Sequence, residues 1–170
     1  MDKVKLKSFL ELQVIWKDDD MFELKVTASN GRYSGIVEVY ETAESLFDFA
    51  QRLIGFPNNN NNLFHEAGIK DGYAYFSMHF YCIDKEGHIG VELILEDKVT
   101  TARFRPEEKV KLKLEVIVEP NAIDIFQKYL SQLATKQDGI AILYGRDNWI
   151  FQFLVILGNG LNCIVEPHEK

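Results

Sequence analysis

The spacing of apolar residues changes period along this chain, and that change constrains the fold more than any other feature. Runs in which apolar and polar residues alternate predict half-buried strands, because successive side chains of a strand point to opposite faces. Two segments instead repeat their apolar residues every three or four positions, which is the spacing of one helix face. The chain therefore predicts an α+β fold in which helices interrupt a series of antiparallel strands.

The strand-like segments are joined by turn residues. Asn30-Gly31 predicts a hairpin with a type I′ turn, because both central positions of that turn need a positive φ. More continuous apolar runs near the C-terminus predict a strand extension over residues 139–170. Together the segments predict an antiparallel sheet of about 8–9 strands. The expected strands are 6–16, 22–28, 33–40, 73–83, 88–95, 110–118, 140–144, 149–157 and 161–165.

Two amphipathic helices are expected, over about residues 43–54 and 120–134. Thr42 can cap the first helix, because its hydroxyl can accept a backbone N–H group of the first turn. Pro120 fits the start of the second helix, where its missing N–H group is not needed. The five asparagines of residues 58–62 predict an exposed loop after the first helix.

Composition limits the classes of function. A chain of 170 residues that is 46% hydrophobic predicts one packed domain over residues 1–170. The formal net charge of −7 argues against direct nucleic-acid binding, which uses clustered cations. The most apolar stretch, residues 149–157, is much shorter than the roughly 20 residues of a membrane-spanning helix, and no signal peptide is apparent. We therefore expect a cytoplasmic protein that does not bind membranes.

The titratable side chains predict no catalytic residues, no metal ligands and no cofactor, so we do not expect an enzyme. The histidines lack the short spacings of zinc ligands. His79 and His88 could meet across the hairpin between them, and whether they share a site stays open at this point. Cys82 and Cys163 both lie in apolar runs, which predicts buried free thiols.

One order of motifs stands out. A strand led by Tyr33-Ser34-Gly35 precedes a helix that ends before Phe56-Pro57, a turn Asp84-x-x-Gly87-His88 joins two later strands, and a strand ending at Glu119 precedes the second helix. The apolar positions of the two helices are Leu46, Phe49, Ala50 and Leu53, then Ile123, Phe126 and Leu130. Over about residues 8–134 this order resembles the WapI-type immunity proteins of bacteria. The resemblance implies a small cytosolic partner that neutralises the nuclease domain of a contact-delivered toxin.

The leading hypothesis is therefore a non-enzymatic immunity protein whose acidic face covers the basic cleft of a toxin domain. Acidic residues near turns are the candidate contacts, because opposite charge steers two proteins together. These residues are Asp18, Asp19, Asp20, Glu96 and Asp97. The alternative hypothesis is a small-ligand-binding domain with an aromatic pocket. Its candidate lining residues are Tyr73, Tyr75, Phe76, Phe80 and Tyr81.

Overall fold

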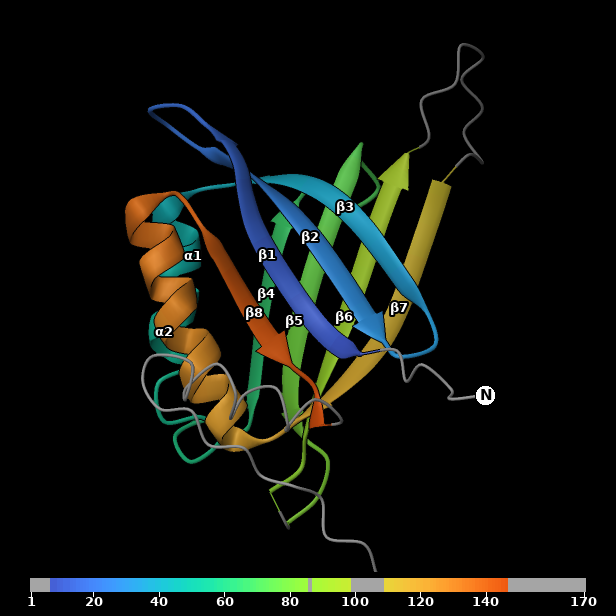
Figure 1. Cartoon of the computed structure of the whole chain (residues 1–170), viewed down its shortest axis with the longest axis vertical. Coiled ribbons are helices and arrows are strands. Elements are labelled where there is room, and N and C mark those ends of the chain that lie inside the picture. Colours follow the sequence, from blue (N-terminus) through green and yellow to red (C-terminus); the bar gives the residue numbers. More distant parts are fainter. Residues whose placement is uncertain (1–6, 86, 99–108, 147–170) are drawn as a thin grey trace, which may run out of the picture.

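Alternating burial defines the strands in the computed structural model of the chain (Figure 1). The structure describes residues 7–85, 87–98 and 109–146. Predicted strands 149–157 and 161–165, together with Cys163, lie outside these residues. The described elements follow in the order β1 (Ser8–Lys17), β2 (Phe22–Asn30), β3 (Ser34–Glu41), α1 (Ala43–Arg52), β4 (Asn62–Gly68), β5 (Ala74–Cys82), β6 (Ile89–Lys98), β7 (Lys109–Val118), α2 (Pro120–Lys136) and β8 (Ile140–Tyr144).

The eight described strands form two antiparallel sheets of four strands each. Sheet A has the order β3-β2-β1-β8, and sheet B has the order β4-β5-β6-β7. The pairing of β1 with β8, in which Leu12 lies opposite Ala141, brings the ends of the described chain together. The predicted α+β class is thus confirmed, with its strands divided between two sheets.

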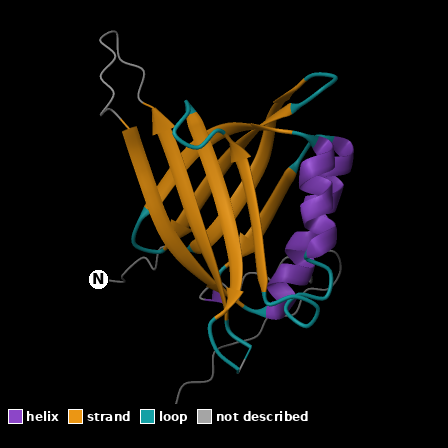
Figure 2. Ribbon diagram, turned by 180° about the vertical axis from the view of Figure 1, so that it is seen from behind, coloured by secondary structure: helices purple, strands orange, loops and turns teal. Residues whose placement is uncertain are grey.

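The two sheets pack face to face, with sheet A in front of sheet B in Figure 1. Both helices lie along one side of the sheets, and α2 contacts α1 and β8 (Figures 1 and 2). Within the described residues, one cluster of buried apolar side chains draws on both sheets and both helices. Phe22 of sheet A, Phe80 of sheet B and Phe126 of α2 are all fully buried in it.

Strand β3 passes across sheet B at close range, and this crossing positions the site described below. A Cβ atom added to Gly35 at the start of β3 would lie 2.7 Å from Leu112 Cδ2 of β7, so a larger residue there would have to displace the Leu112 side chain. Along its length β3 also contacts β6, β5 and β4. Its last residue, Glu41, reaches the side chain of His65 on β4.

Both predicted helices are confirmed, with small changes at their ends. The hydroxyl of Thr42 accepts the Ser45 N–H group at 3.3 Å, as expected of an N-cap, and α2 begins at Pro120. Helix α1 ends at Arg52, two residues earlier than predicted.

The hairpin between β2 and β3 forms where it was predicted, but its turn differs from type I′. Gly31 has a φ of +84°, whereas Asn30 belongs to β2 and is not among the residues with a positive φ. A glycine at the first of two central positions fits a type II′ turn instead. The Asn30 side chain stabilises this turn by accepting the N–H groups of Arg32 and Tyr33.

Strand β4 was missed by the sequence analysis. Its burial alternates regularly, but the polar His65 points into the protein while the aromatic Phe64 is exposed. A polar residue inside and an aromatic residue outside are the reverse of the pattern from which strands are predicted. The run of asparagines ends inside this strand, since β4 begins at Asn62.

Candidate functional sites

The predicted acidic contacts Asp18, Asp19 and Asp20 lie in the exposed turn between β1 and β2. The Asp18 carboxylate accepts the backbone N–H groups of Asp20 at 2.9 Å and Met21 at 2.8 Å. These two hydrogen bonds, that from Met21 above all, lower the pKa of Asp18. Asp18 therefore holds the turn, while the carboxylates of Asp19 and Asp20 are exposed beside it.

Glu96 is buried, whereas a residue predicted to contact a partner should be exposed. Its side chain is only 2% exposed, and its carboxylate forms an ion pair of 2.7 Å with Lys111 Nζ of the adjacent strand. Glu96 lies within the β5–β6 pairing, opposite Tyr75, and not in a turn. We therefore remove it from the candidate contact surface.

Asp97 is exposed and lies close to sheet A. It lines a shallow groove together with Glu23 of β2 and with Ile36, Val37 and Glu38 of β3. Ile36 and Glu38 are exposed because they point away from the core on alternate positions of β3. The crossing of β3 over sheet B thus gathers carboxylates from three strands around one groove.

An exposed aromatic pair lies on the same outer face of sheet A. Trp16 of β1 and Tyr40 of β3 flank Glu23, which is the register partner of both residues. Their ring centroids are 6.2 Å apart with an interplanar angle of 86°, although each side chain is about half exposed. The sequence analysis did not select either residue, because the partnership depends on the register of three strands. We call Trp16, Glu23, Ile36, Glu38, Tyr40 and Asp97 the aromatic–acidic face.

The outer faces of the two sheets differ in how their charges are balanced. On sheet B, Lys111 pairs with Glu96 and Lys113 pairs with Glu92 at 2.9 Å. On sheet A, none of the ion pairs found among the described residues involves Glu23 or Glu38. The carboxylates of the aromatic–acidic face therefore keep their charge available to another molecule.

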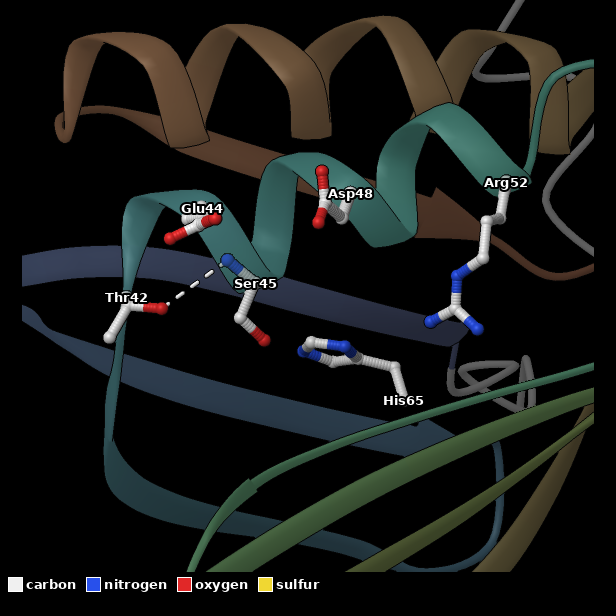
Figure 3. Close-up of a pocket in the computed structure, with 6 residues that line it drawn as sticks. All are labelled: Thr42, Glu44, Ser45, Asp48, Arg52 and His65. Atoms are coloured by element: carbon white, nitrogen blue, oxygen red, sulfur yellow. Dashed lines mark hydrogen bonds between the residues drawn. The ribbon is translucent and has the colours of Figure 1, made fainter.

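A second site is a polar cleft beside α1 with a volume of about 690 Å³. Figure 3 shows the six residues that line it, with the imidazole of His65 below the helix and the guanidinium of Arg52 extending to the same side. The lining residues are Thr42, Glu44, Ser45, Asp48, Arg52 and His65. Its polar groups come from one helix and one strand, which the β3–α1 connection brings together.

The floor of this cleft is a buried histidine–carboxylate pair. His65 Nε2 lies 2.7 Å from Glu41 Oε2, and both side chains are more than nine-tenths buried. The other oxygen of Glu41 accepts the Thr42 N–H group at 2.8 Å. The ring of Phe49 packs against the imidazole with centroids 4.8 Å apart. These contacts fix the position of the ring and leave it facing the cleft.

The cleft does not form a serine–histidine–carboxylate triad. Figure 3 shows the Ser45 hydroxyl directed towards the His65 ring, but no hydrogen bond joins these two side chains in the structure. The Nε2 atom, which would be one possible base, is already bound to Glu41. Activation of a serine needs a base within hydrogen-bond reach of the hydroxyl, so the geometry does not supply a nucleophile.

The other histidines and the cysteine that the sequence singled out are not brought together. His79 lies opposite Glu92 in the β5–β6 pairing and contacts Asn62, whereas His88 bonds Asp84 at 2.6 Å. Cys82 is a half-buried free thiol. Within the described residues, no group of three or more metal-ligating side chains is found.

The proposed aromatic pocket does not form from its predicted residues. Phe76 and Phe80 are buried on the inner face of β5, whereas Tyr75 and Tyr81 lie on its outer face and bond Glu66 and Glu115. The remaining residue, Tyr73, is 74% exposed in the preceding turn. Because strand residues alternate between faces, the four residues of this set on β5 are divided between its two faces.

A comparison with known proteins finds no matching family model, no matching curated protein and no matching solved structure. No helix in the described part of the chain is both long enough and apolar enough to cross a membrane. The arguments for function therefore depend on the two sites themselves.

Proposed function

We propose that this chain is a non-enzymatic interaction protein that binds a basic protein surface through the aromatic–acidic face. The observation that carries the proposal is the exposed Trp16–Tyr40 pair, which lies among carboxylates that have no ion-pair partners in the described structure. Tryptophan and tyrosine are the residues that most often dominate binding energy in interfaces, and a surrounding polar rim excludes water from them. The adjoining turn adds Asp19 and Asp20 to that rim.

Charge supports the choice of partner. The chain carries a formal net charge of −7, and its unpaired carboxylates converge on one groove. Such a face accelerates encounter with a cationic partner and disfavours an acidic one. The nucleic-acid-binding cleft of a nuclease has the required charge. An immunity protein that occludes such a cleft, as the resemblance to the WapI-type proteins implies, is the specific function that we propose.

The proposal can be tested by co-expression with a toxin domain. We expect a reading frame next to this gene to encode a large secreted toxin, and we expect this chain to restore growth when its toxic domain is expressed. The double variant Trp16→Ala/Tyr40→Ala should weaken binding of the toxin domain at least about 30-fold, because each side chain is placed to act as an interface anchor. Isothermal titration calorimetry measures the change.

Two controls make this test specific. Tyr129→Ala removes an aromatic side chain that is 47% exposed on α2, a helix that contacts β8 at the opposite edge of sheet A from β3, and should leave binding unchanged. Circular dichroism should show that all variants remain folded. If growth is not restored by the wild-type chain, the immunity function loses its support. If the Trp16→Ala/Tyr40→Ala variant binds as well as the wild type, the assigned face is wrong.

A further inference from the structure

We propose that residues 149–157 form a further strand, which pairs antiparallel with the outer edge of β7 and extends sheet B. The sequence predicts a strand over these residues, and they lie just beyond the described part of the chain, which ends at Arg146. The inference is independent of the proposed interaction through sheet A, because it concerns another edge of the molecule. The edge, the direction and the register of this strand each follow from a separate observation.

Strand β7 is the open edge of sheet B among the described strands. The two sheets end in four edge strands, which are β3 and β8 in sheet A and β4 and β7 in sheet B. Helices lie beside two of them, because Arg52 of α1 donates to the Phe64 carbonyl of β4 at 3.2 Å and α2 packs against β8. Strand β7 lies on the opposite side of the molecule from both helices (Figure 2). Its ten residues therefore offer a template to which another strand can pair.

The position at which the described chain ends sets the direction of the new strand. Arg146 Nε lies 3.3 Å from Glu119 Oε1, and Glu119 directly follows the last residue of β7. Only residues 147–148 separate Arg146 from the segment, and a step of three residues spans up to about 10 Å. A strand that starts here and follows β7 runs back along it, which makes the pairing antiparallel. Over residues 149–157 it would be about 30 Å long and would match β7 in length.

The inner face of β7 is incompletely covered at this edge. Leu114 and Val116 point into the core and are at most 5% exposed, whereas Val110, on the same face of the strand, is 57% exposed. Strands β1 and β2 of sheet A cross β7, and in Figure 1 the hairpin between β2 and β3 extends past β7 on the side away from β6. A strand added at this edge would lie against sheet A and would cover Val110.

Alternation within the segment determines which side chains point inward. All of its residues except Gln152 are apolar, and burial of an unpaired amide is unfavourable, so Gln152 faces solvent. The inward side chains are then Trp149, Phe151, Phe153, Val155 and Leu157. A register with Trp149 opposite Val118 places Leu157 opposite the exposed Val110. A slip by one residue would exchange the two faces and bury Gln152.

The first experiment is NMR on the full chain labelled with ¹³C and ¹⁵N. Opposite residues of antiparallel strands approach most closely in the pairs that exchange no backbone hydrogen bonds, and these pairs lie on one face. We expect NOEs between Hα atoms of β7 and the segment, either for Lys113 with Leu154 or for Leu114 with Phe153. The proposal is overturned by NOEs of the segment to β3 or β8, by none to β7, or by NOEs to β7 that arise only between molecules in a sample of mixed labelling.

The second experiment compares two neighbouring lysine variants by hydrogen exchange. Phe153→Lys places a charge on the inward face, so the segment should leave β7, and the β7 amides that face away from β6 should exchange at least about tenfold faster. Gln152→Lys places the same charge on the solvent face and should leave exchange unchanged. Amides of β2 should stay protected in both variants, which shows that the domain remains folded. Equal exchange of the β7 amides in the two variants overturns the proposal.

Discussion

His65 Nε2 lies 2.7 Å from Glu41 Oε2, and this contact joins the end of β3 to the middle of β4 at the edge of the core. Because both side chains are buried, removal of one partner leaves the other without its main contact. We expect His65→Leu and Glu41→Leu each to lower the free energy of unfolding by about 3 kcal/mol. Urea denaturation of both variants measures the loss.

The double variant His65→Leu/Glu41→Leu separates a coupled pair from two independent contacts. With both polar side chains removed, apolar side chains occupy the space, so the total loss should be smaller than the sum of the single losses by more than about 1 kcal/mol. Losses that add to within about 0.5 kcal/mol would show that the pair is not coupled.

Trp16 and Tyr40 should contribute little to the stability of the fold, in contrast to the buried pair of His65 and Glu41. Both rings are about half exposed, so neither contributes much to the core. Each single alanine variant should lower the free energy of unfolding by less than about 1 kcal/mol, and the double-mutant cycle should give a coupling of about 0.5 kcal/mol for the edge-to-face contact. Thermal and urea unfolding provide these values. A loss of several kcal/mol would mean that the pair is a structural element and not an available anchor.

The elements of the fold could be predicted where local chemistry and tertiary packing agree. Thr42 caps α1 and Pro120 starts α2 for reasons that act within one turn, and both were identified from the sequence. Strand β4 could not be identified, because His65 is buried by its contact with Glu41, which is 24 positions away. A polar residue that is buried through a distant partner breaks the periodicity that marks a strand.

The candidate sites depend even more on tertiary structure. Asp97 was selected for its charge, but its groove forms only because β3 crosses sheet B and brings Glu38 beside it. Glu96 was selected on the same grounds, but it is buried and pairs with Lys111 across a strand pairing that the sequence does not specify. Trp16 and Tyr40 are 24 positions apart and meet through the register of β2.

The neighbours Glu96 and Asp97 make a matched pair for testing these assignments. Glu96→Gln removes the buried negative charge that pairs with the exposed Lys111, so the free energy of unfolding should fall by about 1–3 kcal/mol. Asp97→Asn changes an exposed side chain and should alter it by less than about 0.5 kcal/mol. Binding of a basic partner should show the reverse order, with only Asp97→Asn reducing the association rate at low salt. Chemical denaturation and stopped-flow mixing measure the two effects.

Because of Tyr81, we expect the folded state to become less stable in strongly alkaline solution. Burial of its ring, together with the hydrogen bond that its hydroxyl donates to Glu115, raises the pKa of Tyr81 to about 12. An unfolded chain ionises the same phenol near pH 10. Between these two values the unfolded state loses a proton that the folded state keeps, so stability should fall as the pH rises through this range. Absorbance at 295 nm follows the phenolate of Tyr81 against a Tyr81→Phe reference.

Gly90 provides a structural check on this titration. A Cβ atom added to Gly90 would lie 2.6 Å from Cζ of Tyr81, so the absence of a side chain on β6 is what allows the ring to lie across the strand and reach Glu115 on β7. Gly90→Ala should displace the ring, expose the hydroxyl to water and lower the pKa of Tyr81 towards 10. Glu115→Gln should lower it less, because burial is the larger cause and remains in place. If Gly90→Ala leaves the titration midpoint unchanged, the ring does not depend on the space that this glycine provides.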